Sequence, residues 1–436
     1  MFKDLPIFFK KDCQYIAYFK EESDSYILEL EQKLKEYKKR FKISDIVIKR
    51  IVSNAKTNTC LIIEAYNLYF SGQINKSIAV ISKLIRKYAF LLIRPLNESP
   101  LFLGNEFFYN KTYRHVNLDR MFMVRARDAK NVNSSKHMNH VPANMRDKVD
   151  SGRFSCHGIP CLYLACNSYI AYREIRKSSK ENVFVSLVEI LKEDLRIIDL
   201  TLPFKYILEW DSFLDEFEKE HTIFKKSSII KTFEIVPLIL ACSFSHNEDE
   251  TIGDCEKEPR KFKSEYVIPQ LIMNFIGNTP SQSKYYSCGI AYESMQIIGS
   301  KIKGTNLAIP ALDSNEEKPQ SKFIGKYFKI YDPFNLGKFV ENFEEYKNEV
   351  NLLNEKRKKP QRFTNESDSD YSKRINANDW KKLNDSKNDK WLFTFNNNML
   401  SDYSEYNKLN YPNFENVGYN ETEFFYFDEF MTTRNQ

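Results

Sequence analysis

The residues with the clearest potential for chemistry lie at positions 150–174, in the stretch DSGRFSCHGIPCLYLACNSYIAYRE. Arg153 follows a glycine, and a Gly-Ile-Pro turn then leads into an apolar run of strand length at 161–165. Asn167 or the serine after it can begin a helix that carries Glu174. A corner between a strand and a helix holds polar side chains in fixed positions. On spacing alone, however, Arg153 and Glu174 are best interpreted as a surface pair on an ordinary strand–helix unit.

The same stretch resembles the RES domain, a family named for an arginine, a glutamate and a serine. The family's segment R-F-S-x-x-G-x-P-C-L-Y-L is present from Arg153 to Leu164, and Glu174 follows on the next predicted helix. Further segments match in the expected order over about half of the chain, which is specific in combination although each is weak alone. They are Val124-Arg125-Ala126-Arg127, His140-Val141-Pro142 with Arg146, Gly289-Ile290-Ala291-Tyr292-Glu293-Ser294, and Asn306-Leu307-Ala308.

The resemblance implies an α+β fold like that of ADP-ribosyltransferases and an enzyme that cleaves NAD. RES relatives include NAD phosphorylase toxins, in which inorganic phosphate attacks the nicotinamide ribose and releases nicotinamide and ADP-ribose-1″-phosphate. Other relatives hydrolyse NAD or transfer ADP-ribose to a protein. Both reactions are alternatives here, as is a domain that binds the nucleotide without cleaving it. NAD is then a substrate with phosphate as co-substrate, no prosthetic group is expected, and an antitoxin or a regulatory partner would restrain the enzyme in a toxin or phage-defence system.

The matched residue types suit this chemistry. A carboxylate stabilises the oxocarbenium-like centre that forms when the bond between ribose and pyridinium breaks. Arginine binds phosphate groups with a planar fork of donors, and an aromatic ring offers a wall for the flat nicotinamide. A serine or an asparagine can hydrogen-bond ribose hydroxyls or phosphate oxygens. The resemblance therefore predicts Glu174, Arg153 and Ser294 as catalytic residues, and Arg125, Arg153, Tyr163, Ser294 and Asn306 as residues that bind NAD.

Two residues near these motifs need separate interpretation. Many RES relatives have a proline before the matched serine, whereas this chain has Glu293. An additional acid beside the site would repel a phosphate nucleophile, which weakens phosphorolysis relative to hydrolysis or transfer. His140 stands beside a proline, where a lone histidine is more often structural than catalytic.

Length and composition limit the class of protein. The chain has 436 residues with 42% hydrophobic residues and a net charge of +6, so two or three domains are expected and the charge alone does not indicate a nucleic-acid partner. Glycine-rich phosphate-binding motifs are absent from the sequence. Its eight cysteines lack C-x-x-C pairs, which favours free thiols in a reducing compartment and predicts no metal site. Without a recognisable signal peptide or an apolar run of membrane-spanning length, the sequence predicts a cytoplasmic protein, and a homo-oligomer is left open.

The order of expected elements divides the chain into three parts. The pattern of residues 1–110 predicts a helical N-terminal domain. One helix is expected to start at Ser23 or Asp24, and two more are expected at 59–70 and 75–92, separated at Ser71-Gly72. Residues 111–335 predict the RES domain, in which the polar loop at 129–151 is of the kind that often covers a site. Strands are predicted at 121–125, 161–165, 183–190, 195–200, 233–244, 287–292 and 306–309, and helices at 167–177, 206–217 and 265–276.

Residues 336–436 form a C-terminal extension of different composition. Low complexity favours disorder, while its tryptophans and tyrosines could instead dock on a folded surface. The acidic, aromatic stretch 420–429 is suited to lie over a site lined with arginine and tyrosine, where it would restrain the enzyme, or to bind a partner. The basic cluster at 356–360 raises nucleic-acid binding as a further class, although a charge run is usually a solvated face.

Overall fold

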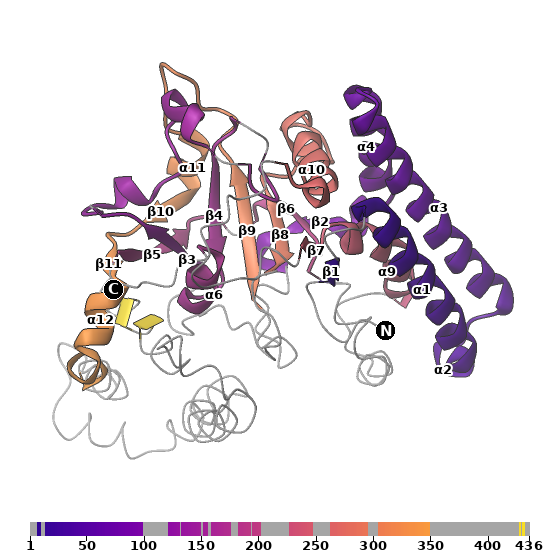
Figure 1. Cartoon of the computed structure of the whole chain (residues 1–436). Helices are drawn as coiled ribbons and strands as arrows, with labels where there is room; N and C mark the ends of the chain where they lie inside the picture. Colours follow the sequence, from indigo (N-terminus) through magenta and orange to yellow (C-terminus); the bar gives the residue numbers. More distant parts are fainter. Residues whose placement is uncertain are drawn as a thin grey trace, which may run out of the picture.

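The computed structural model consists of a central mixed sheet with helices on both faces (Figure 1). This confirms the predicted α+β class with helices at the N-terminus. The predicted boundary near residue 110, the helix at 206–217 and the basic cluster at 356–360 lie outside the described residues, so the division into domains stays a prediction. The structure describes residues 7–9, 14–98, 121–130, 132–149, 151–155, 158–175, 182–192, 194–201, 226–246, 262–294, 304–348, 427–428 and 430–431.

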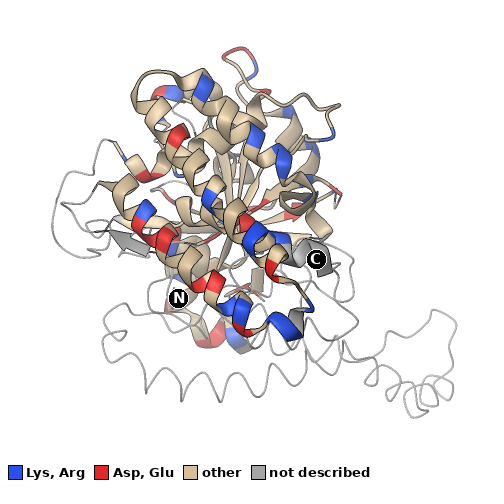
Figure 2. Cartoon of the chain, turned by 90° about the vertical axis from the view of Figure 1, so that its right-hand side faces the viewer, with Lys and Arg blue, Asp and Glu red and all other residues tan. Residues whose placement is uncertain are grey.

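The N-terminal helices form a layer whose outer face is charged with both signs interspersed (Figure 2). Helix α3 begins after Ser44, whose hydroxyl accepts a hydrogen bond from the amide of Val47. It ends at the predicted break, where Gly72 has a φ of +78° that favours glycine. The first helix starts before Ser23, because that serine is buried within it rather than capping it. The helices are α1 Tyr15–Glu36, α2 Lys38–Phe41, α3 Asp45–Phe70, α4 Ile74–Lys87 and α5 Ala89–Leu92.

The strand predicted at 233–244 is wrong, because most of this run belongs to helix α9 (Lys226–Ala241). A continuous apolar run has the same composition in a buried strand and in a buried helix, so periodicity could not separate them. The N-terminal helices surround α9 and bond its backbone: Tyr26 Oη donates to the Phe233 carbonyl at 2.8 Å, and Asn58 donates to the Glu234 carbonyl at 2.6 Å. Beyond the helix, β7 (Phe244–His246) pairs in parallel with β1 (Ile7–Phe9).

The main sheet has the strand order β10-β5-β3-β4-β9-β8-β6-β2, with β11 also paired to β5. All neighbours are antiparallel except β6 and β8, which run in parallel. The predicted strands at 161–165 and 183–190 coincide with β4 and β5, which are apolar and rich in strand-forming residues. The strands are β2 Ile93–Pro95, β3 Met121–Asp128, β4 Cys161–Ala165, β5 Val183–Ile190, β6 Arg196–Asp199, β8 Ile290–Glu293, β9 Thr305–Pro310, β10 Phe328–Ile330 and β11 Phe334–Asn335.

Alternating side chains of the strands contribute to two hydrophobic cores. On β9, Ala308 packs with the N-terminal helices, α9 and α10, whereas Leu307 and Ile309 pack in the core that contains α6 and α12. Tyr292 of β8 belongs to the first core and Ala291 to the second. The remaining short helices are η1 Leu96–Glu98, η2 Ser135–Met138, η3 Ala143–Lys148, α6 Ser168–Glu174, η5 Ser264–Tyr266, α10 Val267–Gly277, α11 Lys322–Tyr327 and α12 Leu336–Glu341.

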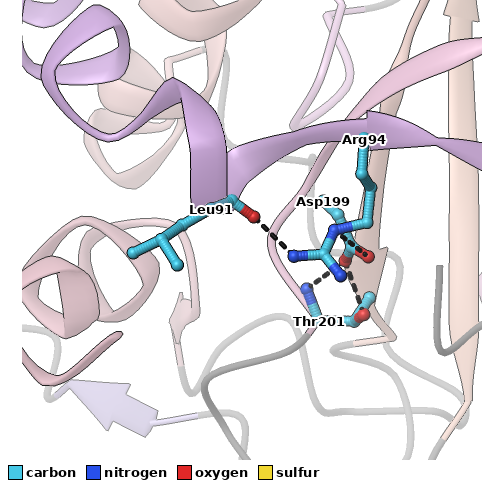
Figure 3. A network of polar contacts seen from close by, with 4 residues as sticks. All are labelled: Leu91, Arg94, Asp199 and Thr201. Atoms are coloured by element: carbon cyan, nitrogen blue, oxygen red, sulfur yellow. Dashed lines mark hydrogen bonds and ion pairs between the residues drawn. The ribbon is translucent and has the colours of Figure 1, made fainter. Parts of the chain in front are cut away.

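A buried ion pair fixes the end of the helical layer to the edge of the sheet (Figure 3). Arg94 of β2 places its Nε 3.5 Å from Asp199 Oδ2 and donates from Nη2 to the Leu91 carbonyl at 2.6 Å. The other carboxylate oxygen of Asp199 accepts from the amide and the hydroxyl of Thr201. Because removing one partner would leave a buried charge uncompensated, this pair specifies how β2 joins the sheet.

Cysteines 161, 166, 242 and 288 are buried free thiols, as predicted, whereas Cys60 is a free thiol on the surface. Among the described helices, none combines the length and apolar character required to cross a bilayer.

Candidate functional site

Glu174 is held at the junction of three elements. It is the last residue of α6, a short helix that begins directly after β4 and is capped by Asn167, whose side chain accepts from the amide of Ile170 at 2.9 Å. The Glu174 Oε1 atom accepts hydrogen bonds from Ser294 Oγ and from Asn306 Nδ2, both at 2.6 Å. Ser294 follows β8, and Asn306 lies in β9. The structure thus brings together three of the residues predicted from the sequence.

These bonds orient the carboxylate without occupying it fully. Ser294 and Asn306 are buried, and the Ser294 amide also donates to the Gly304 carbonyl at 2.5 Å, which holds the backbone after β8 against the start of β9. Both hydrogen bonds converge on Oε1, and within the described part of the chain Oε2 receives none. Glu174 itself is partly exposed. Its second oxygen is therefore available to a ligand, in a geometry set by rigid strands.

Two tyrosines lie near Glu174 on one face of the sheet. Tyr163 is opposite Ala308 in the β4–β9 pair, and Tyr292 is opposite Asn306 in the β8–β9 pair, so their side chains project to the same side. Burial raises the pKa of both phenols well above the usual value, and the charge of Glu174 raises both further. Both hydroxyls are therefore protonated at neutral pH and can act as hydrogen-bond donors.

Tyr292 was not predicted as a site residue, although it lies two positions before Ser294 in a matched segment. Its ring packs against Phe154 with centroids 4.3 Å apart. Tyr292 is opposite Asn306 in the β8–β9 pair. Because side chains alternate along a strand, a residue two positions before Ser294 is expected on the same face, and this spacing was the signal available in the sequence. Phe154 comes directly after Arg153, so the R-F-S segment contacts the site through its phenylalanine.

The backbone around Gly152 fits closely against Tyr163. A Cβ atom on Gly152 would lie 2.4 Å from Tyr163 Oη and 2.8 Å from Ser155 Oγ. The Ser155 hydroxyl accepts a hydrogen bond from the Gly152 amide at 2.9 Å. The glycine therefore allows the loop before Arg153 to approach the phenol of Tyr163, which sequence reasoning did not identify.

Arg153 is buried and uses its guanidinium to bind the protein itself. Nη1 donates to the carbonyls of Cys242 and Phe244 at 3.0 and 2.7 Å, and Nη2 donates to Ser245 Oγ at 3.0 Å. The guanidinium carbon lies 4.9 Å from the ring centroid of Tyr266. Arg153 thus ties its loop to the segment after α9, and these contacts do not include Glu174.

Arg125 lies on β3 and fixes the polar loop over the sheet. Nη1 donates to the Tyr163 carbonyl at 3.1 Å and Nη2 to the Asn139 carbonyl at 3.3 Å. Burial, with a smaller contribution from the charge of Arg127, lowers the pKa of Arg125 to about 10, so it remains a cation at neutral pH. Arg125 therefore adjoins Tyr163 through the backbone of β4, without a direct bond to Glu174.

His140 has a structural position within the same loop. Its Nδ1 lies 2.8 Å from the Val141 carbonyl, and its Nε2 accepts from the Ser321 amide at 2.9 Å. This pattern requires a neutral imidazole with the proton on Nδ1. The histidine connects the loop to the start of α11 and agrees with the structural interpretation of its sequence context.

The side chain of Glu293 projects away from the face that carries Tyr292 and Asn306. Glu293 is opposite Thr305 in the β8–β9 pair, one residue out of phase with Asn306. It is buried, and its charge contributes to raising the pKa of Cys166 to about 12, an effect due first to burial. The Glu293 carboxylate therefore does not share the face of the sheet on which Asn306 binds Glu174.

Among the described residues, no group of three or more histidine, cysteine, aspartate or glutamate side chains is arranged to hold a metal ion.

The chain is similar to a curated protein over part of its length. The chain is 28% identical over 204 residues to a protein of Bacillus subtilis (strain 168) named "Putative toxin YopC". The match covers 46% of this chain and 42% of that protein, so it spans less than half of the relative's length. No family model matches the chain, and no solved structure matches it.

Proposed function

We propose that this chain is an NAD-cleaving enzyme of the RES type that breaks the bond between nicotinamide and ribose and acts as a toxin or defence effector. The observation that carries the proposal is the Glu174 carboxylate, held by Ser294 and Asn306 beside two buried phenols. The similarity to a protein named as a toxin supports the biological role, and the RES-like segments support the substrate.

The geometry suits a reaction that creates positive charge on a sugar. With Oε1 fixed by two donors, Oε2 can face the ribose, where a carboxylate stabilises an oxocarbenium-like transition state more than the ground state. The ring of Tyr163 is partly exposed and offers apolar surface for the nicotinamide, whereas Tyr292 is buried against Phe154. Arg125 supplies a permanent cation next to β4, which suits the diphosphate. Arg153 supports the site through its loop, because its donors already bind protein oxygens.

Phosphorolysis is the first reaction we propose, with NAD hydrolysis or ADP-ribose transfer to a protein as the alternatives. The position of Glu293 gives no reason to exclude phosphorolysis, because its carboxylate does not share the face of Tyr292 and Asn306.

The test compares the wild type with Glu174→Gln during incubation with NAD, following nicotinamide release by chromatography. A glutamine oxygen can still accept from Ser294 and Asn306, so the fold should be retained while the charge is lost. Removing a well-placed electrostatic group costs on the order of a hundredfold in rate. Glu317→Gln is the matched control, because Glu317 is an exposed carboxylate that belongs to none of the matched segments. Equal turnover by the wild type and Glu174→Gln would remove Glu174 from the chemistry.

A further inference from the structure

The C-terminal segment contacts the helix that carries Glu174. Both carboxylate oxygens of Asp428 lie within hydrogen-bond distance of the Ser168 amide, at 3.2 and 3.3 Å, across 260 residues of sequence. Ser168 is the first residue of α6, so its N–H group has no acceptor within the helix. Asp428 is buried, and a carboxylate at this end of a helix is electrostatically favourable.

The neighbours of Asp428 are anchored in the core, and we call Phe427, Asp428, Phe430 and Met431 the C-terminal latch. Phe427 packs edge-on against Phe339 of α12 with centroids 4.9 Å apart, and Phe430 lies 4.7 Å from Tyr346 and 5.0 Å from Phe334 of β11. In Figure 1 the latch, coloured yellow, lies between α12 and α6. Because these aromatic contacts fix the latch, the carboxylate is presented to α6 in a defined position.

Asp428 also lies where the other strands of the site meet α6. Its charge contributes to the raised pKa of Cys166, the residue between β4 and the Asn167 cap. The Cys166 amide donates to the Thr305 carbonyl at 2.9 Å, and Thr305 precedes Asn306 in β9. The latch therefore bonds α6 at its first residue, close to where β4 ends and β9 begins. These three elements carry Tyr163, Glu174 and Asn306.

We propose that the C-terminal latch positions α6 and thereby sets the orientation of Glu174, with Asp428 as a positioning residue for the proposed reaction. This inference rests on the proposed function for its catalytic consequence. It reverses the role expected from the sequence, in which the acidic, aromatic end of the chain lies over the site and restrains it. Asp428 bonds the start of α6, at the opposite end of the helix from Glu174, and Phe427 and Phe430 pack on β11 and α12.

The experiment uses the full-length chain with Asp428→Ala, Asp428→Asn and the control Glu317→Ala. Amide hydrogen exchange of the peptide covering 165–175 is compared with that of peptides from α3, and kcat and KM for NAD are measured on the same samples. We expect Asp428→Ala to exchange about tenfold faster in α6, since a charge-assisted hydrogen bond is lost, and not in α3. We expect its kcat to fall about tenfold with a smaller change in KM.

Asp428→Asn should recover most of both losses, because an amide oxygen can still accept from the Ser168 amide. Recovery of both the exchange rate and kcat in Asp428→Asn would show that the hydrogen bond to Ser168 is required, rather than the acidic group as such. If Asp428→Ala does not fold, Phe430→Leu makes the same comparison, because it loosens the anchor while leaving the carboxylate in place. Three outcomes would each overturn the proposal. They are unchanged exchange in α6, exchange that rises equally in α3, and an unchanged kcat despite faster exchange in α6. If the wild type does not cleave NAD, the proposed function fails, while the exchange comparison still decides whether the latch holds α6.

Discussion

Replacing Gly152 by alanine tests whether the R-F-S loop determines the position of Tyr163. The new Cβ would lie 2.4 Å from Tyr163 Oη and 3.2 Å from Cζ. An ordinary van der Waals contact begins at 3.4 Å, so the phenol must move by about 1 Å. Overpacking of this kind costs about 1–3 kcal/mol of stability. A displacement of this size at a reacting site can reduce turnover by about a hundredfold.

The assay for Gly152→Ala combines chemical denaturation with nicotinamide release from NAD. Gly325→Ala is the control, because a Cβ there meets nothing within 4 Å, and we expect it to be neutral or stabilising by about 0.4–1 kcal/mol. Adding Tyr163→Phe to Gly152→Ala removes the atom in closest contact and should restore part of the lost stability. Wild-type stability and turnover in Gly152→Ala would refute the idea that Gly152 fixes the tyrosine.

Two further predictions follow from the polar contacts around the site. Arg153→Lys should lower the free energy of unfolding by about 1–3 kcal/mol in denaturant titrations, because one ammonium cannot take the places of both Nη1, which binds the Cys242 and Phe244 carbonyls, and Nη2, which binds Ser245 Oγ. Unchanged stability would show that these bonds are dispensable. Burial lowers the pKa of His140 in the folded state. The stability that its neutral form contributes is therefore fully present above about pH 6.5 and is lost as the pH falls through the lowered folded-state pKa. The slope of this loss is at most about 1.4 kcal/mol per pH unit. Thermal unfolding between pH 7.5 and 5 should show this loss in the wild type and in His137→Gln but a smaller one in His140→Gln, and equal slopes in all three would contradict the assignment.

The sequence predicted the parts of the fold that local pattern determines. The strands β4 and β5 were located at their observed ends because short, mainly apolar runs fill them, rich in valine in β5 and containing a tyrosine in β4. Helix α9 was wrongly predicted as a strand because its second half, residues 235–241, is a continuous apolar run, and only its burial among the N-terminal helices distinguishes a helix from a strand there. Local periodicity therefore failed where tertiary contacts determine the structure.

The candidate site shows the same limit. Motif matching located Glu174, Ser294 and Asn306, which the structure joins by hydrogen bonds. The phosphate-binding role of Arg153 stays a prediction. Its Nη1 and Nη2 atoms bind backbone carbonyls and a serine of a segment about 90 residues away, contacts that no local pattern encodes. Asp428 lies in the acidic, aromatic stretch 420–429 that composition marked as a docking segment, but no local pattern could identify its partner, Ser168, which is 260 residues earlier in the chain.

The central claim is that the site around Glu174 cleaves NAD between nicotinamide and ribose. The most direct measurement is mass spectrometry of NAD incubated with the purified full-length chain, with and without inorganic phosphate. We expect nicotinamide together with ADP-ribose-1″-phosphate in the presence of phosphate, and little of either product from Glu174→Gln. Free ADP-ribose as the sole partner product would replace phosphorolysis by hydrolysis, and intact NAD under every condition would contradict the claim.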